Sequence, residues 1–325
     1  MSEKDFSSIL FSPEEIGNQT AAYLEQRRAN KGNGLVVGLD CLDKPNDKGQ
    51  FILPMNPGEL MGIIARPGNG KTGFMVRWAR HRTAALRQRG IEDRAVVYIT
   101  LEQSVEELNA FNLAADRKLS ITNMAVGEIS DSEWIEVLKD SVGRRFHPLW
   151  NVGYSSMTEK KQITVDMQGI IGALNLLQEK HKKIIDTIFV DYLQRIPYMR
   201  AESKTVGISD NLDKLKTLAL RCKSPVIVGV QATREVDDKN HSHIPQLDDG
   251  QWTSNIEQTC DRVISLVRPI TYRKIGEMFN DRKIEGPYEM LVSILKQKLG
   301  PTNFSRWVFF QPEYNKLDQL ERRLP

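Results

Sequence analysis

Short, nearly continuous apolar runs alternate along the chain with segments whose apolar residues recur at the helical spacing. Apolar runs bounded by turn residues are typical of strands buried on both faces of a sheet. The expected strands are Leu60–Ala65, Ala95–Leu101, Val152–Ser156, Thr187–Val190, Val226–Val230 and Arg262–Val267. The expected helices are Ile16–Arg28, Phe74–Leu86, Val165–His181 and Leu212–Cys222, and two more that begin at Ser104 and at Asp131. This alternation predicts an α/β fold with a mainly parallel sheet flanked by helices.

The pattern changes in the last part of the chain. Two apolar runs, Met290–Leu295 and Arg306–Phe310, flank a turn at Gly300-Pro301. Runs joined in this way predict a C-terminal antiparallel hairpin that closes the sheet. Two polar stretches, Tyr198–Asp210 and Ala232–Ser254, are expected to be long loops. Long loops in a compact domain often carry function.

The first residues differ from the rest. Ser12 is typical of a helix cap and Pro13 of the first helical position, and a helical pattern follows. Ala29–Gly34 then has the small and polar residues that are typical of a flexible linker. We therefore expect an arm over residues 1–33 and one globular domain over residues 34–325. The arm helix has little core of its own, so it packs either on its own domain or on an adjacent subunit, and the pattern leaves both open.

A turn rich in glycine joins the first expected strand to the helix that follows it. Its glycines let backbone N–H groups surround anionic oxygens, and the helix adds the positive end of its dipole. Lys71 would reach the β- and γ-phosphates of ATP, and the Thr72 hydroxyl would hold Mg²⁺. The alternative is a chance Lys-Thr after a glycine turn, but the strand before and the helix after favour a phosphate loop. The residues expected to bind the nucleotide are Ala65, Arg66, Pro67, Gly68, Asn69, Gly70, Lys71, Thr72 and Gly73.

Polar residues follow three further strands, at the sheet edge where an open parallel sheet binds its ligand. Asp191 is placed to hold Mg²⁺ through water opposite the phosphate loop. Glu102 is placed to polarise the attacking water as general base, and Gln231 to sense the γ-phosphate. The alternatives are ordinary caps at Asp191 and Glu102 and a residue without a special role at Gln231.

Composition changes this picture little. The 325 residues carry 45 basic and 42 acidic side chains, a net charge of +3, so any nucleic-acid contact must be local. The three cysteines have no metal-type spacing, and no signal region or long apolar run is present, so we expect a cytoplasmic protein without membrane contact. His241 and His243 lack a nearby third ligand, so we expect them to be exposed and not to bind a metal.

The phosphate loop belongs to a series of motifs that occur in a set order along the chain. They are Gly58-Glu-Leu, Ala65-Arg-Pro with Gly70-Lys-Thr, Ile99-Thr-Leu-Glu102, Val190-Asp-Tyr-Leu-Gln194, Ile256-Glu-Gln258, and Lys296-Gln-Lys298 with Gly300-Pro-Thr302. Over residues 34–318 this series resembles the DnaB-like replicative helicases, hexameric motors with a RecA-like domain. The Asp-Tyr-Leu-Gln and Lys-x-Lys-x-Gly-Pro-Thr motifs are much more specific than a phosphate loop alone.

The resemblance implies a RecA-like P-loop ATPase that forms a ring of six subunits, with ATP at each junction, and unwinds duplex DNA while translocating on single-stranded DNA. Lys298 stands where the family usually has an arginine finger, with Lys296 as its companion. Both would reach the γ-phosphate of the neighbour. Lysine supplies charge without the bidentate fork of arginine, although RecA-like recombinases resemble this variant in using a pair of lysines. The alternative for the pair is a solvated hairpin edge.

The DNA-facing residues depart from the family. Where the family has an Arg-Glu-Ser-Gly run, this chain has Gln251-Trp252-Thr-Ser. Trp252 either stacks on a base or packs under the loop, and the pattern favours neither. Arg234 follows Gln231 as in the family, but the acidic residues after it repel phosphate. The predicted DNA contacts are Arg234, Gln251 and Trp252. Residues 1–33 resemble only the family's linker helix, so the N-terminal primase-binding domain is expected to be absent.

Three functions therefore compete. The first is a trimmed helicase motor of a plasmid, phage or mobile element, which would work with a loader or another replication protein. The second is a RecA/KaiC-like oligomeric ATPase that binds or remodels DNA or protein partners without unwinding, and the altered DNA loop favours it. The third is a nucleotide-binding scaffold without turnover. Stimulation of the ATPase by single-stranded DNA separates the first two.

Overall fold

Two units make up the chain, Met1–Leu35 and Val36–Pro325. The computed structural model describes residues 12–29, 34–143, 148–157, 164–198, 201–238, 242–250 and 255–320. In the first unit, helix α1 (Pro13–Ala29) begins with a reciprocal cap. The Glu15 backbone donates to the Ser12 hydroxyl at 3.2 Å, and the Ser12 backbone donates to the Glu15 carboxylate at 2.7 Å. The predicted cap at Ser12 is confirmed.

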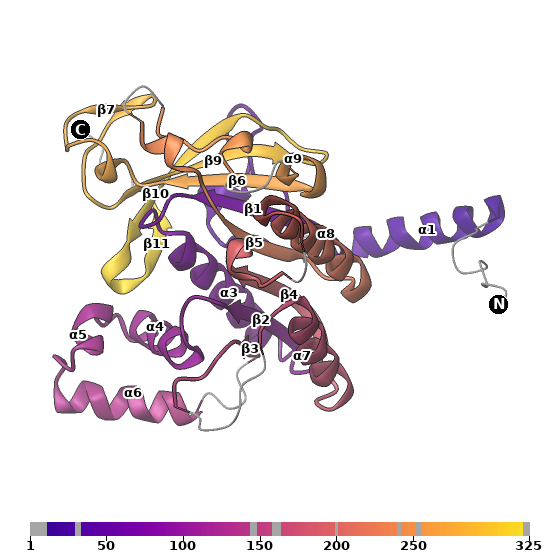
Figure 1. Cartoon of the computed structure of the whole chain (residues 1–325), viewed down its shortest axis with the longest axis horizontal. Helices are drawn as coiled ribbons and strands as arrows, with labels where there is room; N and C mark the ends of the chain where they lie inside the picture. Colours follow the sequence, from indigo (N-terminus) through magenta and orange to yellow (C-terminus); the bar gives the residue numbers. More distant parts are fainter. Residues whose placement is uncertain are drawn as a thin grey trace. The chain divides into compact units, whose positions relative to one another are not determined.

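In the part of the second unit that the structure describes, nine strands form one sheet in the order β11-β10-β9-β6-β1-β5-β4-β2-β3 (Figure 1). The six strands from β6 to β3 are parallel, and β9, β10 and β11 are antiparallel to their neighbours. The strand bounds are β1 Leu60–Ala65, β2 Arg94–Thr100, β3 Leu149–Val152, β4 Ile184–Asp191, β5 Val226–Gln231, β6 Arg262–Val267, β9 Glu289–Gln297, β10 Phe304–Gln311 and β11 Lys316–Gln319. A separate two-stranded sheet pairs β7 Met278–Phe279 with β8 Arg282–Lys283. The predicted mainly parallel sheet with a C-terminal antiparallel hairpin is confirmed.

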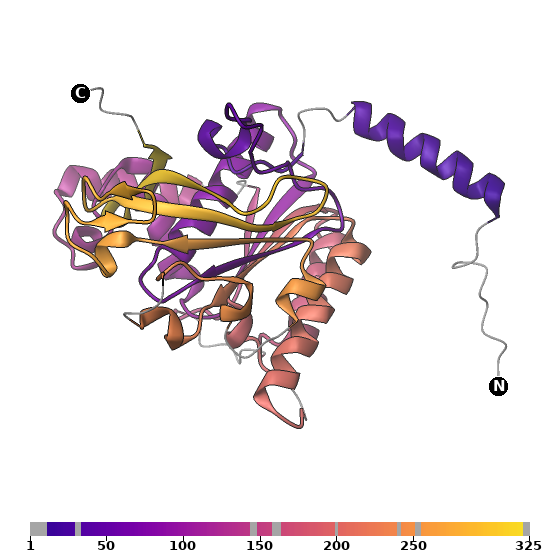
Figure 2. The ribbon, with the colours of Figure 1, turned by 90° about the horizontal axis from the view of Figure 1, so that it is seen from above.

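Helices cover both faces of this sheet (Figure 2). Their bounds are α2 Asp40–Asp43, α3 Lys71–Gln88, α4 Val105–Arg117, α5 Ile121–Ala125, α6 Asp131–Gly143, α7 Met167–Glu179, α8 Lys204–Cys222 and α9 Ile256–Thr259. The aliphatic face of β1, β2, β4 and β5 packs on α7 and α8 in one continuous core. On the other face α3 brings Trp78 against Phe189, with ring centroids 6.0 Å apart, and Phe189 stacks on Tyr98 at 6.0 Å. Apolar packing on both faces therefore fixes the strand ends that carry the site.

Two local predictions were wrong. The expected strand Val152–Ser156 is β3 at Leu149–Val152, because the apolar positions that pair with β2 come earlier. The expected loop Tyr198–Asp210 is helical from Lys204, where the Ser203 hydroxyl caps α8 by accepting from the Val206 backbone at 3.2 Å. The first part of α8 was not predicted, because the polar residues on its exposed face outnumber the apolar residues that mark a helix.

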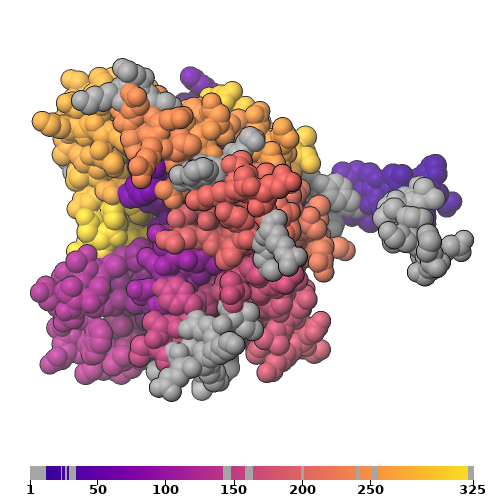
Figure 3. All heavy atoms as spheres, viewed as in Figure 1, coloured from indigo at the N-terminus to yellow at the C-terminus, as the bar shows by residue number. Residues whose placement is uncertain are grey.

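The segment between β2 and β3 forms a lobe of three helices, α4, α5 and α6, shown in magenta in Figure 3. Its own small core contains Leu113, Ala114, Met124 and Val137. Among the described residues, no helix combines the length and apolar content needed to cross a membrane. The cytoplasmic location expected from the sequence stays a prediction.

Candidate functional site

Strand register brings the predicted site residues to one edge of the sheet. Ala65 at the end of β1 pairs with Gln231 at the end of β5, and Thr100 at the end of β2 pairs with Asp191 at the end of β4. Because these strands are parallel, the residues after them share the same edge. The loops that carry Lys71 and Glu102 begin there, since they follow β1 and β2 directly.

The turn between β1 and α3 has the geometry of a phosphate loop. Gly68 and Gly70 have φ values of 77° and 85°, a left-handed conformation that side chains disfavour. A Cβ on Gly70 would lie 2.5 Å from the Met290 methyl and 2.7 Å from the Phe310 ring, so only glycine fits. The Asn69 side chain accepts from the Arg268 backbone at 2.7 Å and fixes the loop from β6. The first backbone N–H groups of α3, which begins at Lys71, are thus presented to an anion.

Lys71 lies between an acid and an aromatic ring. Its Nζ is 3.6 Å from Asp191 Oδ1 and 3.7 Å from the centre of the Tyr192 ring. Burial lowers the pKa of the Lys71 ammonium, and the charges of Asp191 and Glu102 offset part of this effect. A triphosphate would supply the stronger counter-charge that this buried cation lacks.

Asp191 fits the predicted Mg²⁺ site. One carboxylate oxygen accepts from the Tyr98 hydroxyl at 3.1 Å. The buried Oδ1 is 3.6 Å from the Lys71 ammonium and has no hydrogen-bond partner among the described residues. An anionic oxygen without a hydrogen bond suits a metal-bound water, which donates hydrogen bonds. Thr72 on the first turn of α3 is half-buried, and its hydroxyl would complete the site together with Asp191. The Tyr98 contact was not predicted, because the sequence shows only another strand residue there.

Glu102 is exposed and is not the capping acid of the next helix. In α4 the Ser104 side chain accepts from the Glu107 backbone, and the Glu107 carboxylate accepts from the Ser104 backbone at 2.7 Å. The alternative interpretation of Glu102 as a cap is therefore excluded. The turn that holds it is fixed on its other side by the Thr100 hydroxyl, which donates to the Gln103 carbonyl at 2.8 Å.

A second contact secures the helix after Glu102. The Glu106 carboxylate accepts from the hydroxyls of Ser155 and Ser156 and, at 3.0 Å, from the Ser156 backbone. The Val105 backbone also donates to the Tyr154 carbonyl at 3.0 Å. The segment after β3 thus binds the first turn of α4 and restricts the loop that carries Glu102.

This contact gives a pH-dependent prediction. Hydrogen bonds from Ser155, which has the largest effect, and from Ser156 lower the pKa of Glu106 from 4.5 to about 2. The contact therefore stabilises the fold fully above pH 4.5 and is lost as the pH falls toward 2. We expect Ser155→Ala to lower the free energy of unfolding by less than about 1 kcal/mol at pH 7, since the pair is solvent-screened.

Urea unfolding at stepwise lower pH measures this difference, which should shrink below pH 4.5. The same substitution in a Glu106→Gln background serves as control and should show no such pH dependence. A difference that is constant with pH would contradict the assignment.

Gln231 is held through its backbone by Gln194 of the Asp-Tyr-Leu-Gln motif. The Gln194 side-chain oxygen accepts from the Gln231 backbone at 3.1 Å, and its amide donates to the Gln231 carbonyl at 3.3 Å. These contacts use only the backbone of Gln231, so its side-chain amide can bind another partner at the sheet edge. The structural role of Gln194 was missed, although the motif containing it was recognised.

Arg66 of the phosphate loop pairs with Asp237 on the 3-10 helix η3 (Arg234–Asp237). The guanidinium reaches the carboxylate at 2.6 Å and the Ala232 carbonyl at 3.0 Å. The Tyr272 hydroxyl donates to the same carboxylate at 3.1 Å. The phosphate loop is therefore tied to the segment after Gln231.

Lys298 and Lys296 lie at the edge of the sheet opposite to the phosphate loop. The Lys298 backbone donates to the Asp261 carbonyl at 3.0 Å, and Asp261 precedes β6 at the end where β1 begins. The Lys298 side chain is 62% exposed. The Lys296 ammonium donates to the carbonyls of Glu257 and Cys260, so it is engaged within its own chain.

The predicted DNA residues are only partly described. Arg234 is exposed on η3, whereas Gln251 and Trp252 lie outside the described residues. The predicted exposure of His243 is wrong, and His241 is also outside the described part. His243 is buried, stacks on Tyr272 with centroids 4.4 Å apart, and contacts the Val236 carbonyl through Nδ1 at 2.8 Å.

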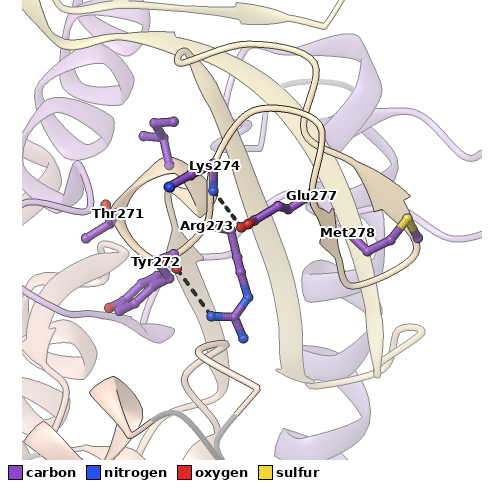
Figure 4. A pocket seen from close by; sticks show the side chains of 7 residues that line it. Thr271, Tyr272, Arg273, Lys274, Glu277 and Met278 are labelled. Carbon is purple, nitrogen blue, oxygen red and sulfur yellow. Dashed lines mark hydrogen bonds between the residues drawn. The ribbon is translucent and has the colours of Figure 1, made fainter.

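A concave surface of about 650 Å³ lies on the segment that connects β6 to β9 (Figure 4). Its lining residues are Ile270, Thr271, Tyr272, Arg273, Lys274, Glu277 and Met278. The Lys274 backbone donates to Glu277 at 2.8 Å within it. Tyr272 connects this hollow to the Arg66–Asp237 pair, but Lys71, Glu102 and Asp191 do not line it.

Comparison with known proteins agrees with this geometry. The family model for the DnaB-like helicase C-terminal domain matches residues 34–319. The replicative DNA helicase DnaB of Helicobacter pylori is 27% identical over 277 residues, which cover 82% of this chain and 51% of that protein. DnaB of Geobacillus stearothermophilus is 25% identical over 327 residues, covering 99% of this chain and 65% of its own length. The chain thus spans less than two thirds of either relative.

Solved structures share the fold. A structure of an ATPase domain superposes with a TM-score of 0.75 at 21% identity, covering 95% of this chain and 100% of that one. The structure of a DnaB-like replicative helicase, studied with its interactions with primase, gives a TM-score of 0.66 at 22% identity over 82% of this chain and 60% of that one.

Proposed function

Because the chain belongs to the DnaB-like helicase C-terminal domain family, we propose that it is an ATP-hydrolysing motor that translocates on single-stranded DNA and unwinds duplex DNA. One observation carries the proposal. A phosphate loop with a largely buried lysine, an acid with an oxygen that lacks a hydrogen bond, and an exposed glutamate follow β1, β4 and β2 at a single sheet edge. Each of these groups has a separate role in phosphoryl transfer to water.

Lys71 and the backbone of Gly68–Thr72 would hold the phosphates of ATP. Thr72 and Asp191 would hold Mg²⁺, which neutralises charge on the phosphate oxygens when bound. Glu102 would orient the attacking water and accept its proton. Gln231 would contact the γ-phosphate and transmit its presence to the segment behind it, since Gln194 fixes its backbone.

The position of Lys298 supports a homo-oligomer with ATP at subunit junctions. Lys298 lies at the sheet edge away from the phosphate loop of its own chain, so it is suited to reach the loop of a neighbour. Such head-to-tail contacts generate rings or filaments, and we propose a hexameric ring. Lys296 would support the hairpin through its α9 contacts and lie beside Lys298 at the junction. Residues 1–33 are proposed as an arm and residues 34–325 as the motor domain.

Single-stranded DNA would contact the segment after Gln231, where Arg234 is exposed, together with Gln251 and Trp252. A loader or another replication or mobile-element protein is a further proposed partner. A second function, an oligomeric ATPase that remodels without unwinding, is favoured by Glu235, Asp237 and Asp238, whose charges repel DNA phosphates near Arg234.

The ATPase rate with and without single-stranded DNA tests the proposal. We expect at least about tenfold stimulation, because a coupled motor reaches its active geometry only when DNA orders the loop that Gln231 contacts. Unwinding of a forked duplex by the same preparation should follow. An unchanged rate together with no unwinding by active oligomers would favour the second function, and a wild-type rate equal to that of Glu102→Gln would indicate a scaffold.

A further inference from the structure

The Arg66–Asp237 contact joins two parts of the molecule that the proposed motor must coordinate. Arg66 is the first residue after β1 in the phosphate loop, and Asp237 ends η3, which begins with Arg234. Three guanidinium nitrogens participate. Nε bonds Asp237 Oδ1 at 3.1 Å, Nη2 bonds Oδ2 at 2.6 Å, and Nη1 bonds the Ala232 carbonyl at 3.0 Å. An arginine with this bidentate geometry makes the strongest class of side-chain ion pair.

The contact is built into its surroundings. The Arg66 side chain is only 14% exposed, and Tyr272 donates to Asp237 at 3.1 Å while its ring stacks on buried His243. Burial raises the pKa of Asp237, but the hydrogen bonds from Arg66 and Tyr272 outweigh this and leave it lowered. The carboxylate is therefore charged at neutral pH and available to pair with Arg66.

We propose that the Arg66–Asp237 pair is a nucleotide-displaceable clasp that holds residues 232–238 in a state of low DNA affinity. A triphosphate bound a few residues along the loop offers Arg66 a competing anion and places negative charge near Asp237. Release of Asp237 would free η3, and with it Arg234, to meet a DNA strand. The inference deepens the proposed function, and its prediction for DNA binding rests on that function.

This clasp explains why an acidic residue stands in a segment expected to bind DNA. A carboxylate beside Arg234 weakens phosphate binding whenever it is near the strand. If the same carboxylate also keeps the segment bound to the phosphate loop, it suppresses DNA binding in the absence of nucleotide. Asp237 is thus a positioning residue, which acts through Arg66 and not on the reacting atoms.

Hydrogen exchange of the backbone tests the clasp without DNA. The Thr233 backbone donates to the Asp249 carbonyl at 2.7 Å and the Asp238 backbone to the Glu235 carbonyl at 3.0 Å, so exchange in 232–238 reports whether the segment is held. In the full wild-type chain, a non-hydrolysable ATP analogue with Mg²⁺ should raise this exchange at least about fivefold. Asp237→Asn should show the raised exchange without the analogue.

Fluorescent oligo-dT binding tests the consequence for DNA. Wild type should bind at least about tenfold more tightly with the ATP analogue than without it, and Asp237→Asn should abolish most of this ratio by raising the nucleotide-free affinity. Glu235→Gln is the matched control, since it removes the same charge from an exposed residue of η3 and leaves the Arg66–Asp237 pair in place. Tyr272→Phe removes one hydrogen bond to Asp237 and should lie between wild type and Asp237→Asn.

Equal hydrogen exchange in nucleotide-free wild type and Asp237→Asn would overturn the clasp. It would also be overturned if Glu235→Gln raised the nucleotide-free affinity for oligo-dT as much as Asp237→Asn does, because that result would indicate simple charge repulsion. Exchange that responds as expected in a protein that never binds oligo-dT would support the clasp while removing DNA from the proposed function. The two failures are therefore distinguishable.

Discussion

Glu102→Gln is expected to lower ATPase turnover by about a hundredfold or more while ATP still binds. A positioned general base contributes about 10²–10⁴-fold to proton transfer, and glutamine keeps the shape of the side chain without accepting the proton. Glu102 is exposed two residues after β2, and the helix after it is capped by Ser104 together with Glu107. The substitution should therefore remove chemistry and leave the fold intact.

The measurement is phosphate release at saturating ATP, together with binding of a fluorescent ATP analogue. Glu107→Gln is a suitable control, because it removes the same charge five residues on while glutamine still serves a capping box. It should retain the wild-type rate. A Glu102→Gln protein with turnover close to wild type would assign the general base to another residue.

A mixture of two inactive variants is expected to recover activity if each ATP site is shared. Lys71→Ala removes the phosphate-loop lysine, and Lys298→Ala removes the proposed charge at the neighbouring site, each with an expected loss of about a hundredfold or more. In an equal mixture, about a quarter of head-to-tail junctions would pair an intact phosphate loop with an intact Lys298. The mixture should regain ATPase activity that neither variant has alone.

Steady-state ATPase assays of the mixture and of each variant alone measure this recovery of activity. Lys283→Ala, which removes an exposed lysine from β8, is the control and should keep full activity in isolation. A purified single subunit that hydrolyses ATP unaffected by loss of Lys298 would refute the shared site.

The local chemistry of the site followed from sequence because it depends on neighbours in the chain. The turn from Gly68 to Lys71 and the start of a helix at Ser104 each depend on residues a few positions apart, so glycine conformation and side-chain reach predict them. The ends of β4 and β5 were equally clear, since a polar residue terminates each buried run. The parallel sheet needed only the alternation of strands and helices.

Contacts between distant segments were not predictable in the same way. The Tyr98 hydroxyl meets Asp191 only because β2 pairs with β4 in one register, and Arg66 meets Asp237 across 171 positions. His243 was expected to be exposed because a polar segment surrounds it, yet stacking on Tyr272 buries it. No local period encodes such pairings, which arise from the folded arrangement of loops.

Strand β9 has an additional consequence for the timing of hydrolysis in the proposed ring. Met290 near its start touches the glycine turn of its own phosphate loop, and Lys298 follows its last residue. Nine residues of strand span about 30 Å, and hydrogen bonds to β6 on one side and β10 on the other make this a stiff connector. If Lys298 reaches the neighbouring site as proposed, a shift at one nucleotide would be passed along the strand to the next. Successive subunits of the proposed ring would then hydrolyse ATP in sequence and not independently.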